Sequence, residues 1–221
     1  MIVDTMTLQE VGETILKTAI RNIPTIGKLI MRKDKVYKRI IYKGQKERYD
    51  FLPMTFEADG IEFHICPYSK GKSDYKKYGI ANGLFAHIFY RRTNWYCLIT
   101  YDYQSVVMYS NHFFERYIER HLKDSTQVNA ETVRRYFKET DYLTMCQVID
   151  NPKYKNCIYG STNIGVCCGE IVSSNVKVFK TFIDMETLTQ GDKKETFDSG
   201  QTFFANLITN KLGIREFKGV A

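Results

Sequence analysis

The chain has 221 residues, of which 43% are hydrophobic and 26% are charged. This balance is typical of a globular protein with a sizeable core. It contains no run of about 18 apolar residues, so we expect no transmembrane helix. The formal net charge of +7 favours an anionic partner, nucleic acid before an acidic membrane surface; a merely basic surface is the alternative.

The N-terminal stretch MIVDTMTLQEVGE carries an acid where a signal peptide needs positive charge, so secretion by that route is not expected. The six cysteines lie in mainly apolar stretches and form no C-x-x-C pair. This pattern predicts reduced, buried cysteines in a cytoplasmic protein, not disulfides or a zinc site. They are Cys66, Cys97, Cys146, Cys157, Cys167 and Cys168.

The first predicted element is a helix that begins at Thr7. The spacing of Thr7 and Glu10 fits a capping box, in which a hydroxyl and a carboxylate satisfy backbone amides. Val11 and Ile15 then begin an apolar stripe at helical spacing, which predicts packing on a sheet. We expect this helix to end before Pro24.

Residues 28–49 form the basic segment, with nine lysines and arginines against two acids. Their excess of positive charge equals that of the whole chain. We interpret the segment as two strands that turn at Lys43-Gly44-Gln45. Such a ribbon would bind phosphates, and the alternative is a solvated edge hairpin. The predicted nucleic-acid-binding residues here are Lys35, Lys38, Arg39, Lys43 and Arg48.

From Ile61 to Ser110 four strand-like runs follow one another. His64 and His87 lie inside them, and each is read as a core or sheet residue, not as a ligand. Residues 69–83 are rich in lysine and glycine and are predicted to be a mobile basic loop.

The stretch SNHFFERYIERH predicts a short helix with Ser110 or Asn111 as its N-cap. His112, Arg116 and Arg120 then lie at i, i+4 and i+8, so their side chains share one face. One imidazole and two guanidinium groups in a row can hold a phosphate and move a proton. The alternative is an amphipathic helix whose outer residues pair in salt bridges.

Two further helices are predicted within residues 125–150, the first capped by Asn129. Arg134 and Arg135 extend the basic surface and are further candidates for nucleic-acid binding. Three strands with turns between them are predicted next, the last being VKVFKTFI. In it Lys177 and Thr181 are polar members of an otherwise apolar face, which indicates the border of a cleft or a mixed edge strand. A last helix is expected from Asp198.

These elements predict an α+β fold, in which an antiparallel sheet packs against several helices after a basic N-terminal helix and hairpin region. Residues 1–60 would form that region and residues 61–221 the main domain, unless the two are one continuous domain.

The sequence lacks phosphate-binding and metalloprotease motifs, and its carboxylates do not cluster as a two-metal nuclease requires. His112 and His121 are nine residues apart and face opposite sides of an ideal helix, so no metal or other cofactor is expected. Metal-free RNA cleavage needs only a base, an acid and cations for the phosphorane charge. His112, Arg116, Arg120 and Thr181 are the predicted catalytic residues.

The order of a His-x-x-x-Arg-x-x-x-Arg helix, a second helix and antiparallel strands resembles the toxin-type ribonucleases of the barnase, colicin and RelE group. The matching residues are His112, Arg116 and Arg120, with Thr181 in the last strand, and the resemblance covers residues 110–185 only. It implies a metal-independent ribonuclease, so RNA is favoured over DNA as the partner. The alternatives are a non-catalytic nucleic-acid-binding or assembly protein, possible in a phage, and a protein–protein scaffold.

Overall fold

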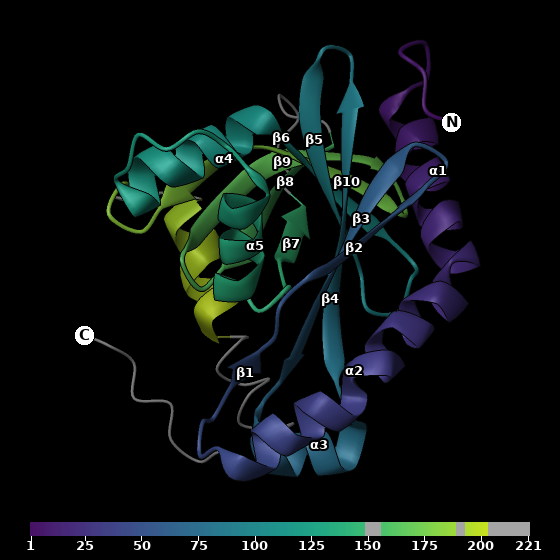
Figure 1. The fold of residues 1–221 in the computed structure, drawn as a ribbon. Coiled ribbons are helices and arrows are strands. Elements are labelled where there is room, and N and C mark those ends of the chain that lie inside the picture. The colour runs from purple at the N-terminus through teal and green to yellow at the C-terminus, as the bar shows by residue number, and fades with distance from the viewer. Residues whose placement is uncertain (149–155, 189–192, 203–221) are drawn as a thin grey trace. The chain divides into compact units, whose positions relative to one another are not determined.

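The computed structural model describes residues 1–148, 156–188 and 193–202 (Figure 1). The chain forms two compact units. Unit 1 contains Met1–Asn111 and Val172–Val178, and unit 2 contains His112–Ile171 and the described residues after Val178. Helices and largely antiparallel strands make up both, which confirms the predicted α+β class. The predicted division near residue 60 concerns independent folding and stays a prediction.

Helix α1 spans Leu8–Arg21 and begins with the predicted capping box. The Thr7 hydroxyl accepts a hydrogen bond from the Glu10 amide at 3.2 Å, and the Glu10 carboxylate accepts one from the Thr7 amide at 2.7 Å. The helix ends at Asn22, before Pro24, as its sequence predicts. Its buried stripe, which includes Val11 and Ile15, packs into the core of unit 1.

Helix α2 spans Ile23–Lys43, and it replaces the predicted basic hairpin, which was wrong. The buried residues Ile26, Tyr37 and Ile41 are spaced for one face of a helix, not for alternating sides of a strand. The Tyr37 ring stacks on Phe51 at 4.1 Å, which fixes that face against the following segment. Gly44, the expected turn residue, instead ends the helix.

The strands of unit 1 pair in the order β1-β3-β4-β5-β6, and β2 also pairs with β3. One row of buried residues, Phe63, Ala86, Cys97 and Met108, crosses β3 to β6 in register. These side chains and the apolar stripe of α1 form the core. The strands are β1 (Tyr49–Asp50), β2 (Met54–Ala58), β3 (Ile61–Ser69), β4 (Ala81–Tyr90), β5 (Thr93–Ile99) and β6 (Val106–Ser110).

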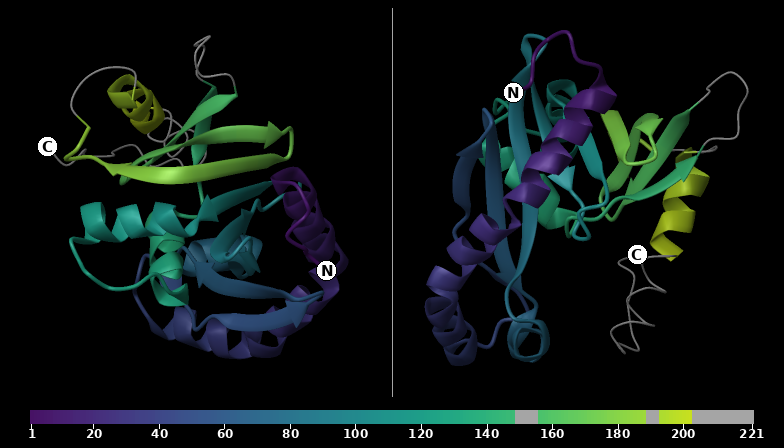
Figure 2. Two further views of the ribbon diagram at one scale, coloured as in Figure 1. Left: turned by 90° about the horizontal axis from the view of Figure 1, so that it is seen from above. Right: turned by 90° about the vertical axis from the view of Figure 1, so that its right-hand side faces the viewer.

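Helix α1 approaches the sheet closely at Gly12. A Cβ atom there would lie 2.7 Å from Val176 and 3.2 Å from Val106, so only glycine fits without a shift. Figures 1 and 2 show α1 leading directly into α2 along one side of these strands.

Helix α3, Gly71–Tyr78, lies where a mobile loop was predicted, and that prediction was wrong. Gly71 and Gly79 have positive φ angles of 88° and 75° and bound the helix, so these glycines are its ends and not signs of an open loop. The Tyr75 hydroxyl donates to Asp34 of α2 at 3.0 Å, which ties the two helices together.

His64 and His87 are sheet residues, as predicted. His64 on β3 is 3% exposed, and its ring stacks on Phe85 at 4.5 Å. The two ring nitrogens of His87 on β4 lie 3.2 Å from Glu62 and 3.1 Å from Asn94.

Unit 2 begins with α4, Asn111–Tyr117, whose first residue closes unit 1, and continues through a π-helical turn, η1, Ile118–Leu122. Helix α5, Ala130–Glu139, begins at the predicted cap, where the Asn129 side chain accepts from the Thr132 amide at 3.0 Å. Rings from α4, α5 and β10 pack edge to face and form the aromatic core of this unit; they are Phe113, Phe114, Tyr117, Tyr136, Phe137 and Phe182.

The helix predicted to restart at Asp141 was wrong, because Met145–Val148 is strand β7. Asp141 and Tyr142 have φ angles of 55° and 57°, a left-handed conformation that interrupts helical geometry. Strands β8 (Cys157–Thr162), β9 (Gly165–Ser173) and β10 (Val176–Asp184) confirm the predicted meander. The last described helix has already formed at residues 193–202, so it begins before Asp198.

Candidate nucleic-acid interface

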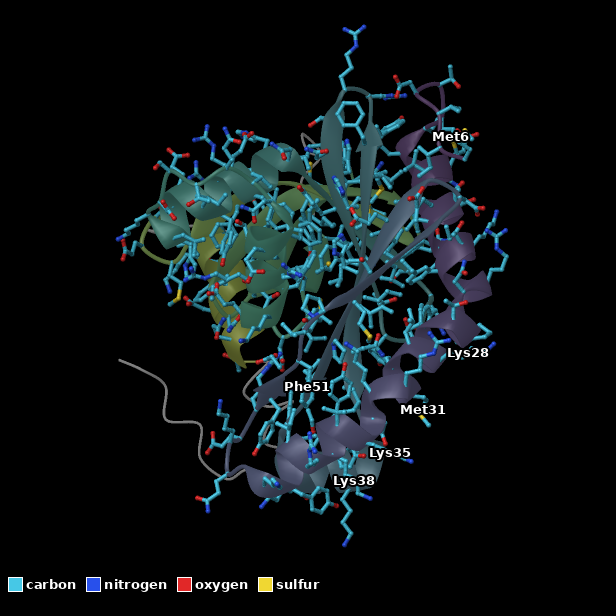
Figure 3. All side chains as sticks on the ribbon, in the orientation of Figure 1. Met6, Lys28, Met31, Lys35, Lys38 and Phe51 are labelled. Carbon is cyan, nitrogen blue, oxygen red and sulfur yellow. The ribbon has the colours of Figure 1, made fainter. Side chains whose placement is uncertain are left out.

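Five cationic side chains share the exposed side of α2 and form what we call the basic face: Lys28, Arg32, Lys35, Lys38 and Arg39. At about 100° per residue, Lys28, Lys35 and Arg39 lie within about 40° of one another and opposite the buried Ile26 and Tyr37. Figure 3 shows Lys28, Met31, Lys35 and Lys38 following one another along the outer side of the helix. The row from Lys28 to Arg39 is about 16 Å long.

The basic face is not neutralised by neighbouring acids. Within residues 1–148, 156–188 and 193–202, none of its five side chains forms an ion pair. Asp34, the one acid of α2, is bound by the Tyr75 hydroxyl through both oxygens, at 3.0 and 3.2 Å. Burial and the Asp34 carboxylate raise the pKa of Tyr75, so this hydroxyl keeps its proton. The five cations therefore face solvent with their charge uncompensated.

The other predicted nucleic-acid-binding residues have different surroundings. Lys43 is exposed in the last turn of α2. Arg48 pairs with Asp50 at 3.0 Å and stacks over the Tyr68 ring at 4.9 Å, so its charge is partly compensated. Lys177 on β10 is half-buried.

In unit 2, the predicted basic surface of α5 is paired with acids of the same helix. Arg134 binds Glu131, and the Nε atom of Arg135 donates to Glu139 at 2.9 Å. The hydrogen bond to Glu139 raises the pKa of the Arg135 guanidinium, which is charged in any case.

The predicted catalytic stripe of α4 and η1 also pairs with acids on its own helix. His112 Nδ1 lies 3.1 Å from Glu115, and Arg116 Nη1 donates to Glu119 at 2.5 Å. Arg116 Nε also lies 3.4 Å from His112 Nε2, so the two predicted partners are neighbours. This is the salt-bridged helix that the sequence left open as an alternative.

Arg120 reaches the last strand of unit 2. Its Nη1 donates to the Phe182 carbonyl at 2.6 Å. This contact brings Arg120 next to half-buried Thr181, the neighbour of Phe182 in β10. The predicted approach of the helix to this strand is therefore present at Arg120, although the guanidinium is engaged by backbone.

A second polar cluster in unit 2 was missed at the sequence level. Glu139 Oε2 accepts from the Tyr117 hydroxyl at 2.5 Å and lies 3.4 Å from His121 Nε2, while Arg135 binds Oε1. The His121 and Glu139 side chains are 30% and 27% exposed. Burial, followed by the bond to Glu139, raises the pKa of Tyr117.

The sequence holds part of this signal. Tyr117 and His121, like Arg135 and Glu139, are four residues apart on their helices, which predicts two neighbouring pairs. Only the packing of α4 and η1 against α5 brings the two pairs to one carboxylate. The π-helical turn also changes the direction of His121 from that on an ideal helix.

No protein-family model, no curated protein and no solved structure matches this chain. Among the described residues, no three histidine, cysteine or acidic side chains come together as a metal site would require. The helices of the described part are all too short or too polar to cross a membrane.

Proposed function

We propose that this protein binds nucleic acid through the basic face of α2. The observation that carries the proposal is the row of five cations on one exposed helix side, without an ion pair to any described residue. A row of lysines and arginines attracts phosphates and releases the counterions condensed on them, which drives binding without base recognition. Cations already paired with acids, as on α5, contribute less because the pairing must be broken.

The expected partner is a nucleic acid of either kind; the preference for RNA over DNA and a cytoplasmic location belong to this proposal as predictions from the sequence. Protein–protein assembly alone would give no salt-dependent affinity for nucleic acid, which distinguishes it from this proposal.

The test compares two double variants of equal charge. In one, Lys35→Ala and Arg39→Ala remove cations from the basic face. In the control, Lys17→Ala and Arg21→Ala remove cations of α1 that pair with Glu13 and Asp59. Fluorescence anisotropy with labelled oligonucleotides at low salt should show weaker binding for the first variant only. Equal loss in both would contradict a specific role of α2, and no binding by the unmodified protein would contradict the proposal itself.

Metal-independent RNA cleavage is the second candidate function, and the Glu139 cluster is the observation that favours it. A partly exposed carboxylate and imidazole lie 3.4 Å apart beside the Arg135 guanidinium. The carboxylate would take the proton of a 2′-hydroxyl as this oxygen attacks phosphorus. His121, when protonated, would then give a proton to the departing 5′-oxygen. The products would be a 2′,3′-cyclic phosphate and a 5′-hydroxyl.

The experiment for this activity measures cleavage of labelled RNA in the presence of a chelator. The variant Glu139→Gln keeps the size of the side chain and removes its basicity, while His112→Ala tests the stripe predicted from the sequence. Loss of cleavage in the first variant alone would assign the activity to Glu139, and loss in the second alone would assign it to His112. Intact RNA with the unmodified protein would exclude this second candidate, and circular dichroism would check that each variant is folded.

A further inference from the structure

We infer that the basic face of α2 selects double-stranded over single-stranded nucleic acid and reads no base sequence. The inference rests on the proposed nucleic-acid binding and adds the class of the ligand. Three features of the face support it: the placement of its cations, its aromatic side chains and the chemistry of the residues between the cations.

The cations form a preorganised row. Lys28, Arg32, Lys35 and Arg39 follow one another at steps of four, three and four residues, or about 4.5–6 Å along the axis. The helix that carries them is anchored on its other side by Tyr37 and Ile41. A duplex likewise holds its phosphates in regular rows, so neither partner loses much conformational freedom on binding. A flexible single strand must be ordered to match the row, which costs entropy.

The face offers no free aromatic ring that would offset this cost. Single-strand binders stack bases on aromatic side chains. On α2 the Tyr37 ring is covered by Phe51. Tyr42 meets Tyr75 edge to face, and the Lys38 ammonium lies over its ring at 5.9 Å. The exposed apolar residue among the cations is Met31, which has no ring.

Base recognition would also need polar side chains that distinguish base edges. Asparagine and glutamine, which pair with adenine, do not occur between Ile23 and Lys43. The basic face consists of long cations around Met31, and such cations bind phosphates of any sequence. We therefore expect similar affinities for duplexes of unrelated sequence.

The experiment measures binding of the full chain to labelled duplex DNA, duplex RNA and unstructured single strands of the same length, from about 50 to about 200 mM salt. Both duplexes should bind at least about tenfold more tightly than the single strands, with little dependence on sequence. The logarithm of the association constant should fall linearly with the logarithm of salt concentration, with a slope of about −4 for four to five phosphate contacts.

The variant Lys28→Ala/Lys35→Ala should reduce this slope by about 2 for the duplex, while the control Lys17→Ala/Arg21→Ala should leave it close to that of the unmodified protein. Equal or tighter binding of single strands would overturn the duplex inference and leave nucleic-acid binding standing. No binding of any ligand would overturn the proposed function as well. A duplex preference unchanged in the Lys28/Lys35 variant would overturn its assignment to α2.

Discussion

The Tyr117 hydroxyl donates a hydrogen bond of 2.5 Å to the Glu139 carboxylate, 22 residues away in the sequence. The bond joins α4 to the last residue of α5. Tyr117 is fully buried among aromatic rings, whereas Glu139 remains partly exposed and also binds Arg135. A buried phenol that donates to a carboxylate is a charge-assisted interaction, stronger than a neutral hydrogen bond.

Replacing Tyr117 by phenylalanine should therefore destabilise the protein. The ring and its packing remain, but the carboxylate loses its buried donor, which costs about 1.5–3 kcal/mol. Urea unfolding followed by circular dichroism measures this change. The control is Tyr101→Phe, at a ring that is 85% exposed, and it should leave stability unchanged. An unfolding midpoint of Tyr117→Phe equal to that of the unmodified protein would show that the bond contributes little.

Gly160 on β8 has no room for a side chain. A Cβ atom would lie 2.5 Å from Phe179 and 2.6 Å from Thr144, and Phe179 is itself fully buried. Gly160→Ala should thus cost about 1–3 kcal/mol through overpacking. Thermal unfolding would detect it as a lowered Tm, and an unchanged Tm would indicate that the Phe179 ring moves aside without penalty.

Gly27 provides the opposite case. It lies inside α2, and a Cβ atom there would meet nothing within 4 Å. Gly27→Ala should stabilise the protein by about 0.5–1 kcal/mol, because alanine loses less backbone entropy in a helix. A lowered Tm would contradict the helical assignment of this part of α2, which the sequence was first read against.

The capping box of α1 can be tested at its first residue. Thr7→Ala removes the acceptor of the Glu10 amide and the side chain that holds the Glu10 carboxylate. The expected loss is about 1 kcal/mol, within the usual range for an N-cap. The variant Thr7→Ser, which keeps the hydroxyl, should recover most of this stability; failure to do so would assign the loss to the threonine methyl group.

The same capping box predicts a pH dependence. The Thr7 amide, and then its hydroxyl, lower the pKa of Glu10 below its ordinary value of 4.5. The ionised carboxylate therefore stabilises the fold above pH 4.5, and this contribution is lost as the pH falls through the lowered pKa. The Tm difference between the unmodified protein and Glu10→Gln should be largest near neutral pH and shrink below pH 4.5. A difference that stays constant down to pH 3 would contradict the expectation.

The sequence by itself determined the features that depend on neighbours along the chain. Thr7 and Glu10 cap α1, Asn129 caps α5, and the alternating strands of both units lie where their residues predict. The excess positive charge of residues 28–49 was also readable, because composition does not depend on folding.

Tertiary structure decided what that charge is attached to. Tyr37 and Ile41 fit a strand or a helix locally, and the contact of Tyr37 with Phe51 selects the helix, which gathers the cations on one side. Likewise, a pattern of spacing cannot show that Tyr117 and Arg135, on different helices, meet at Glu139. Periodicity is set by backbone geometry within a few residues, whereas the partner of a side chain depends on which elements pack together.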